Sequence, residues 1–318
     1  MDFDDTPQPH AIVTNLKYKG DCLLAHQKKI NSIAWNCSGQ WLATGSADGT
    51  ILIWSTHRDS HPQILKRSYL YKLEGHTRDV QQIVWHPSNP SQLYSIADDR
   101  TIKYWDLSHS GGYCVATIKT KYDNIYLAIS SGAKYLSTGS KNNYLNIYDL
   151  NKNREIACIH YNWDIYIYIY IYEMCWTKNE KYLLLTTAAN SDGWGRLEVL
   201  QPANNKINRV LILPAHTSRC CCIHVNPRGD TFITGSADSF INFWDLDEFI
   251  CFKTIKGERS VRALRYNFNG KYLATCNKDN YVTIYNTETG EEVMNIRTSS
   301  YVDISLYKYR YIYIDIHK

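Results

Sequence analysis

The sequence predicts an all-β fold in which similar four-stranded antiparallel sheets are arranged radially as the blades of a β-propeller. Short β-branched and aromatic runs alternate with turn residues along most of the chain, as expected for strands. Tyrosine accounts for 26 of the 318 residues, and aromatic residues favour strands over helices. A set of polar and aromatic residues also recurs at fixed spacing, which is the signature of a repeat architecture.

The clearest repeat runs from His216 to Asp245. In it Asp238 lies 22 residues after His216, Thr234 lies four residues before Asp238, and Trp244 lies six after it. Two other units carry the same residue types at this spacing, one of them with a single extra residue after the histidine. The three sets are His26, Thr44, Asp48 and Trp54; His76, Ser95, Asp99 and Trp105; and His216, Thr234, Asp238 and Trp244.

Three further units keep only part of the pattern. The third unit has Asn142 at the aspartate position, the sixth has Asp279, and neither has the histidine. The fourth is the most degenerate, although Trp176 is present. Successive markers are separated by 41 to 52 residues, close to the ~40–45-residue period of WD40 blades. The chain therefore resembles the seven-bladed WD40 propellers, with six recognisable blades.

The two ends predict how the ring closes. Residues 1–14 are polar and contain two prolines, so we expect a flexible arm, followed by one propeller domain over 15–318. The marker after Asp279 would fall near position 325 at this period, beyond Lys318. We expect an incomplete seventh blade with strands at 302–306 and 309–316, closed by an N-terminal strand at 16–24. A truncated or mis-spliced C-terminus would explain its missing strand.

The segment 165–172 reads IYIYIYIY. Alternation of this kind predicts a half-buried strand, at the place where the fourth blade needs its innermost strand. The same dipeptide repeat is also typical of low-complexity coding sequence.

Composition and cysteine spacing exclude several classes of function. The net charge is +4 and 21% of residues are charged, and no apolar run reaches the ~18 residues of a membrane span. The ten cysteines include no C-x-x-C pair. Cys220, Cys221 and Cys222 would alternate between strand faces, so buried thiols are favoured over a metal site with His216 or His224. We expect reduced thiols, because no secretory signal is recognisable, and neither metal nor cofactor.

The His–Ser/Thr–Asp sets resemble a catalytic triad, but they recur once per blade, and no P-loop or G-x-S-x-G motif accompanies them. We therefore expect no enzyme. The WD40 resemblance implies instead that each set forms a buried hydrogen-bonded chain between strands. Such a network is favourable only when every member has a partner.

Four segments resemble a narrower family, the WD40 subunit of THO complexes. They are His86–Pro90, Ile118–Ile125, Gly235–Ile255 and Phe268–Gly290. The resemblance covers roughly residues 22–297 and departs at the Ile-Tyr segment and after Thr298. It implies a nuclear, non-enzymatic scaffold of the THO and TREX assemblies, which couple transcription to mRNA processing, packaging and export. It also implies docking on a large helical THO subunit, with indirect or weak RNA contact and no small-molecule substrate.

The loops before the inner strands and the turns at the marker positions would share one face of the propeller. Basic residues occupy these places: Lys28, Lys29, Arg78, Arg100, Lys141, Arg219, Arg259 and Lys278. This basic rim could receive an acidic segment or RNA phosphates. An ordinary solvated rim, diluted by Asp79, Asp98 and Glu258, is the alternative. No RNP-type motif or aromatic stacking platform is recognisable.

Two alternative functions remain from the sequence. One is a substrate receptor of a cullin-type ubiquitin ligase, but the blade ends WDLS at 105 and WDLD at 244 lack the W-D-x-[RK] string typical of such receptors. The other is a scaffold in an unrelated pathway, since a fold alone does not fix function.

Overall fold

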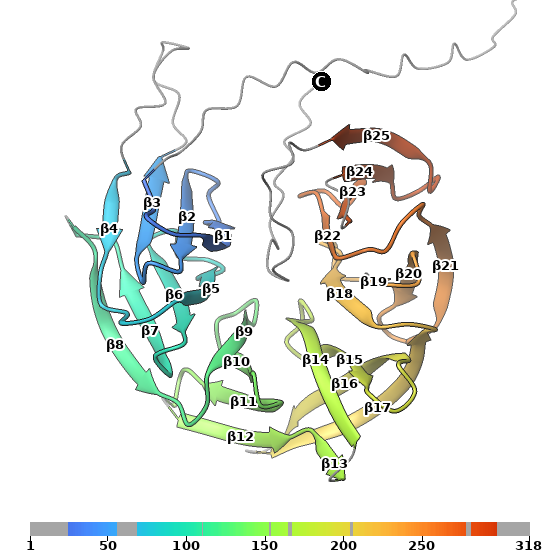
Figure 1. Cartoon of the computed structure of the whole chain (residues 1–318), viewed down its shortest axis with the longest axis horizontal. Helices are drawn as coiled ribbons and strands as arrows, with labels where there is room; N and C mark the ends of the chain where they lie inside the picture. Colours follow the sequence, from blue (N-terminus) through green and yellow to red (C-terminus); the bar gives the residue numbers. More distant parts are fainter. Residues whose placement is uncertain are drawn as a thin grey trace, which may run out of the picture.

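The computed structural model describes residues 25–55, 69–109, 111–152, 154–164, 167–203, 206–277 and 281–297. Its regular secondary structure within these ranges is entirely β. The strands form six antiparallel sheets, which follow one another around a central axis as the blades of a propeller (Figure 1). The predicted all-β propeller with six recognisable blades is therefore confirmed. The described residues contain no helix of the length and apolarity that a membrane span requires.

The first three blades have four strands each, and every blade is a simple meander from the axis outward. The first blade contains β1 (Ile30–Trp35), β2 (Trp41–Ser46), β3 (Ile51–Ser55) and β4 (Tyr71–Leu73). The second contains β5 (Val80–Trp85), β6 (Gln92–Ala97), β7 (Thr101–Asp106) and β8 (Tyr113–Lys119). The third contains β9 (Asn124–Ile129), β10 (Tyr135–Ser140), β11 (Tyr144–Asp149) and β12 (Arg154–His160).

The last three blades follow the same plan, except that the fourth has an additional strand. The fourth contains β13 (Asn162–Asp164), β14 (Ile167–Trp176), β15 (Leu183–Ala189), β16 (Gly195–Ala203) and β17 (Lys206–His216). The fifth contains β18 (Cys220–Val225), β19 (Thr231–Ser236), β20 (Phe240–Asp245) and β21 (Cys251–Lys256). The sixth contains β22 (Ala263–Tyr266), β23 (Tyr272–Cys276), β24 (Tyr281–Asn286) and β25 (Glu292–Arg297).

Residues 167–172 of the Ile-Tyr segment lie in β14, the inner strand of the fourth blade, as the position of the segment in the repeat predicted. Ile169 and Ile171 are buried in the core between the third and fourth blades, whereas Tyr170 between them is 45% exposed. This alternation follows from the two-residue period of a strand, which places successive side chains on opposite faces. The segment therefore has a definite place in the fold.

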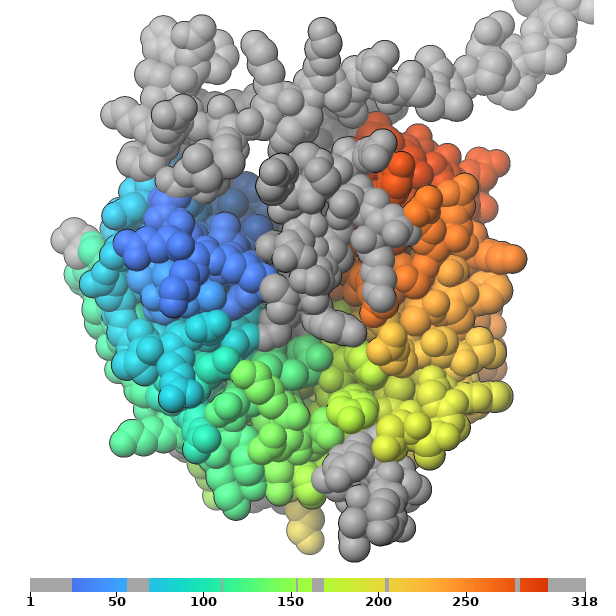
Figure 2. Space-filling view, viewed as in Figure 1, coloured from blue at the N-terminus to red at the C-terminus, as the bar shows by residue number. Residues whose placement is uncertain are grey.

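The hydrophobic core consists of five buried clusters, each lying between two consecutive blades. Consecutive blades pack against each other without a break from the first to the sixth (Figure 2). Gly45 and Gly235 show how closely they approach. A Cβ atom at Gly45 would lie 2.7 Å from Val80 in the next blade, and one at Gly235 would lie 2.6 Å from Val261. The second strand of one blade thus rests directly on the inner strand of the next.

Several predictions concern residues outside these ranges. They are the arm at 1–14, the closing strand at 16–24, and the seventh-blade strands at 302–306 and 309–316. Lys278 and Asp279 also lie outside the described residues. The single-domain boundaries at 15–318 therefore stay a prediction.

Candidate functional site

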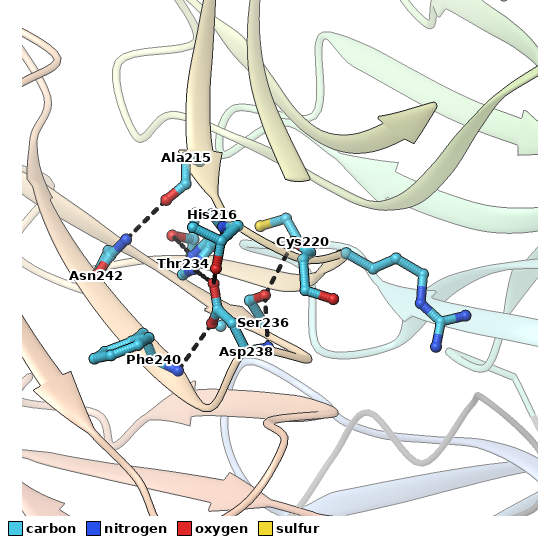
Figure 3. Close-up of polar contacts among 12 residues, drawn as sticks. Ala215, His216, Cys220, Thr234, Ser236, Asp238, Phe240 and Asn242 are labelled. Atoms are coloured by element: carbon cyan, nitrogen blue, oxygen red, sulfur yellow. Dashed lines mark hydrogen bonds and ion pairs between the residues drawn. The ribbon is translucent and has the colours of Figure 1, made fainter. Parts of the chain in front are cut away.

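The structure brings the four repeat residues of the fifth blade into one hydrogen-bonded chain, and Figure 3 shows three of them, His216, Thr234 and Asp238. Nδ1 of His216 lies 3.1 Å from a carboxylate oxygen of Asp238, and Nε2 lies 2.8 Å from the Thr234 hydroxyl. The indole of Trp244 donates to that hydroxyl at 2.9 Å. An indole N–H can only donate, so the hydroxyl accepts from Trp244 and donates its own hydrogen to Nε2. The imidazole proton is then on Nδ1, facing the carboxylate.

The first and second blades repeat this geometry. His26 contacts Asp48 at 3.0 Å and Thr44 at 2.8 Å, and Trp54 donates to the Thr44 hydroxyl at 2.9 Å. In the second blade, His76 contacts Asp99 at 2.9 Å and Ser95 at 2.8 Å, and Trp105 donates to Ser95 at 2.8 Å. Each chain joins the segment before an inner strand to the second and third strands of the same blade. In the fifth blade this segment begins at His216, the last residue of β17.

The second oxygen of each aspartate organises the adjoining turn. Oδ1 of Asp48 accepts from the backbone and the hydroxyl of Thr50, at 2.9 and 2.6 Å. Burial alone would raise the pKa of Asp48, but the bonds from Thr50, from the Gln27 backbone and from His26 together lower it to about 2. Burial lowers the pKa of His76, because it disfavours the charged imidazolium, and the neighbouring Asp99 opposes this effect. Hydrogen bonds from Thr101 and His76 lower the pKa of Asp99 against the effect of its burial, so a carboxylate beside a neutral imidazole is the stable arrangement in the second blade.

This arrangement is suited to holding a blade together rather than to catalysis. The hydroxyls of Ser95 and Thr234 belong to side chains that are 0% exposed, and both are occupied by an indole and an imidazole. A nucleophile needs access to its substrate, which a fully buried hydroxyl lacks. The catalytic interpretation of the His–Ser/Thr–Asp sets is therefore incompatible with the geometry of the described sets.

Three blades depart from the pattern, and two of them show what the missing histidine leaves behind. In the third, Thr138 is 0% exposed, yet its hydroxyl has no hydrogen-bond partner among the described residues. In the sixth, Gly257 occupies the histidine position. A cavity of about 170 Å³ lies there, lined by Gly257, Thr275 and Tyr285 among others. In the third blade the missing histidine thus leaves a buried hydroxyl without its usual partner, and in the sixth it leaves a cavity.

The basic rim is less uniform than the sequence suggests. Lys28, Arg78 and Arg259 are exposed, whereas Lys29 and Arg219 are half-buried. Arg100 forms an ion pair at 2.8 Å with Asp123, and Lys141 forms one at 2.8 Å with Asp98. Both pairs join the second blade to the third. Arg259 lies 5.2 Å from the centre of the Tyr281 ring. Two of the rim cations therefore have a carboxylate partner within the chain.

The cysteine cluster forms no candidate metal site in the part of the chain that the structure describes, where no group of three possible ligands occurs. Cys220 and Cys222 are buried and Cys221 is half-buried. Burial raises the pKa of the Cys220 and Cys222 thiols well above the ordinary value. His224 accepts a hydrogen bond at 3.2 Å from the backbone N–H of Tyr266, which lies on the inner strand of the next blade.

The structure also contains a buried ion pair near the axis, which the repeat pattern does not predict. Glu173, in β14, contacts Arg265 of the sixth blade at 2.7 Å. The other Glu173 oxygen accepts the backbone N–H of Ile223 in the fifth blade at 3.1 Å. One carboxylate thus connects the inner strands of three consecutive blades. The indication of this ion pair in the sequence is Glu173 itself, which is the one charged residue in the strand segment IYIYIYEMCW.

Comparison with known proteins agrees with this architecture. The family model of the WD domain, G-beta repeat, matches residues 18–55, 67–106 and 207–245. A model of the anaphase-promoting complex subunit 4 WD40 domain matches residues 242–310. Together with the six blades and their histidine networks, these matches define a WD40 β-propeller.

Among similar proteins, THO complex subunit 3 of Arabidopsis thaliana is 30% identical over 296 residues, covering 92% of this chain and 86% of that protein. The chain belongs to the THO complex subunit 3 family. The WD repeat-containing protein AAC3 of Dictyostelium discoideum is 25% identical over 274 residues, 80% of this chain and 55% of that protein. Cell division cycle 20.1, cofactor of APC complex, of Arabidopsis thaliana is 23% identical over 223 residues, 70% of this chain and 36% of that protein.

Proposed function

We propose that this chain is a non-enzymatic scaffold subunit of a nuclear THO/TREX assembly. In that role it couples transcription to mRNA processing, mRNP assembly and nuclear mRNA export. The observation that carries the proposal is the extent of the similarity, which spans 92% of this chain and 86% of the Arabidopsis THO complex subunit 3. A match to one repeat would indicate only a WD40 blade. Similarity over a whole propeller supports a shared partner surface.

The proposed partner is a large helical THO subunit that presents an acidic segment to the basic rim. Lys28, Arg78 and Arg259 are exposed, and they come from the loops before the inner strands of three different blades. An array of cations on one face attracts an acidic partner and accelerates its association. The ion pairs of Arg100 and Lys141 reduce the net charge between the second and third blades. We therefore expect Arg100 and Lys141 to contribute less to docking than the exposed Lys28 and Arg78.

Affinity purification of the tagged full chain from nuclear extract, followed by mass spectrometry, tests the proposal. We expect the other THO subunits among the recovered proteins, with the large helical subunit at stoichiometric level. Recovery of a ubiquitin-ligase adaptor without THO subunits would contradict the proposal. Nuclear localisation of the tagged chain is a further expectation of the same experiment.

Charge reversal of the rim tests where the partner docks. We expect the triple variant Arg78→Glu, Arg219→Glu and Arg259→Glu to lose partner capture while its unfolding temperature stays unchanged. A matched control reverses three exposed cations in the turns at the opposite ends of the inner strands, namely Lys134, Arg228 and Lys271. This control should capture the partner as the wild type does. Equal capture by both variants would show that the rim is only a solvated surface.

A second candidate is an adaptor of the anaphase-promoting type of ubiquitin ligase. The similarity to the cofactor of APC complex from Arabidopsis and the match at residues 242–310 favour it over an unrelated scaffold. That similarity covers only 36% of the cofactor, so it supports the shared blades more than a shared role. The purification above distinguishes the two candidates directly.

A further inference from the structure

Three aromatic rings form a stack on the third blade, at the end of the strands where the rim lies. The Tyr122 and Tyr144 ring centres are 3.9 Å apart with planes inclined by 12°, and those of Tyr144 and His160 are 4.1 Å apart and inclined by 16°. Tyr122 comes from the loop before β9, Tyr144 begins β11, and His160 ends β12. Tyr144 and His160 face each other across neighbouring strands. Tyr144 is therefore the middle ring.

The stack lies at the surface. His160 is exposed and the two tyrosines are half-buried, and none of the three is among the buried core residues of the described chain. The ammonium group of Lys121 lies 5.3 Å from the centre of the Tyr122 ring. One end of the stack thus carries a cation, and the other ends in the exposed imidazole of His160.

Further cations surround the same loop. Arg100 contacts the Asp123 carboxylate at 2.8 Å, and the Lys141 backbone N–H donates to the Asp123 carbonyl at 2.9 Å. The Arg100 and Lys141 side chains are 63% and 44% exposed. Exposed ion pairs of this kind contribute only about 0–1 kcal/mol, so a phosphate can compete for these cations.

We propose that this aromatic stack is a binding site for single-stranded RNA. A nucleobase stacks on the exposed face of His160, and the sugar-phosphate backbone passes along the side of the stack toward Lys121, Arg100 and Lys141. Base–aromatic stacking combined with phosphate contacts gives binding that tolerates sequence. An acidic peptide would use the cations alone and would leave the ring faces without a role. The choice of RNA rather than DNA rests on the proposed function.

The test is fluorescence anisotropy of a short labelled single-stranded RNA of mixed sequence, titrated with the purified full chain at low and moderate salt. His160→Ala should weaken binding by roughly 5- to 150-fold, the range that loss of one base–aromatic contact produces. Tyr144→Ala should also weaken binding, because it removes the ring on which His160 stacks. Tyr144→Phe keeps the ring and should bind as the wild type does. Tyr113→Ala is the matched control. Tyr113 is 49% exposed and begins β8, whereas the loop that carries Tyr122 follows the other end of that strand. Lys121→Gln should reduce the salt dependence of binding by about one counterion.

Several outcomes would overturn the proposal. Absence of RNA binding at low salt would do so, and so would wild-type affinity in a folded Tyr144→Ala protein. Displacement of the RNA by polyglutamate, together with insensitivity to Tyr144→Ala and His160→Ala, would assign the surface to an acidic protein partner. Tighter binding of single-stranded DNA of the same sequence would reject RNA as the ligand. If Tyr144→Ala does not fold, His160→Ala at the exposed end of the stack gives the same comparison.

This outcome is separable from that of the scaffold proposal. The binding assay uses the isolated chain, whereas the scaffold proposal is tested by recovery of THO subunits. We expect His160→Ala to recover those subunits as the wild type does. A chain that recovers no THO subunit but binds RNA through the stack would refute only the scaffold proposal.

Discussion

Replacing Thr234 with valine isolates the hydroxyl of a complete histidine network, because the two side chains have nearly the same shape. In the native chain this hydroxyl accepts from the Trp244 indole at 2.9 Å and contacts Nε2 of His216 at 2.8 Å. The third blade offers a matched control at the equivalent position. Thr138 is also 0% exposed, and its hydroxyl has no hydrogen-bond partner among the described residues. The same substitution therefore removes two hydrogen bonds in one blade and none in the other.

The expected magnitude follows from the groups left behind. Thr234→Val leaves the indole N–H of Trp244 and Nε2 of His216 buried without their partner, and each such group costs about 1–3 kcal/mol. We therefore expect a loss of about 2–6 kcal/mol in the free energy of unfolding. An unfolding entropy of about 2.1 cal/mol/K per residue, applied to 318 residues, gives a fall in Tm of roughly 3–9 °C. Thr138→Val should be neutral or slightly stabilising, since it removes a buried polar group that lacks a partner.

Thermal unfolding followed by tryptophan fluorescence, with urea titrations at one temperature, measures both variants on the same scale. The double variant should show the sum of the two effects, because the sites lie in different blades. Equal losses in Thr234→Val and Thr138→Val would refute the reasoning, since the hydrogen-bond network would then contribute nothing beyond packing. A larger loss in Thr138→Val would refute it as well.

Three further changes test other parts of the fold by urea unfolding. Arg265→Met removes the ion-pair partner of the buried Glu173 carboxylate and should cost about 3–5 kcal/mol, much of it recovered when Glu173→Gln is added. Burial is the main cause that lowers the pKa of His224 to about 3, and the nearby Arg265 adds to it. Between pH 6.5 and pH 3 the unfolded chain therefore binds a proton that the folded chain does not, so stability should decrease as the pH falls through this window. The decrease should be less steep in His224→Gln. Gly195→Ala should be strongly destabilising because its Cβ would meet backbone atoms at 2.5 and 2.6 Å, whereas Gly257→Ala, whose Cβ would lie 3.3 Å from its nearest backbone oxygen, should cost much less.

The sequence predicts the propeller well because its evidence is periodic. The spacing between His216, Thr234 and Asp238 is dictated by one loop and two strands whose lengths vary little from blade to blade. The two-residue alternation likewise predicts that Ile169 and Ile171 share one face of a half-buried strand and Tyr170 lies on the other. These features are local, and physical rules for strands and turns act over the same short distances.

Contacts between blades could not be predicted in this way. Glu173 and Arg265 lie on inner strands two blades apart, and the fixed period says nothing about which side chains approach across the axis. The ion pairs of Arg100 and Lys141 likewise join residues of different blades. Counting cations along the chain therefore overstated the charge of the rim. The distribution of charge on the rim depends on which carboxylates lie beside its cations in the folded chain.

The third blade shows how a departure from the repeat can create a binding surface. In the second blade, Thr101 donates to the Asp99 carboxylate at 2.6 Å and is thus part of the inner network. The equivalent position in the third blade is Tyr144, and Asn142 replaces the aspartate. Without the histidine and the carboxylate, the network has no anchor at this position, and the Tyr144 ring stacks with its neighbours at the surface instead. The sequence change that weakens the internal hydrogen bonding of this blade is therefore the same change that builds its aromatic stack.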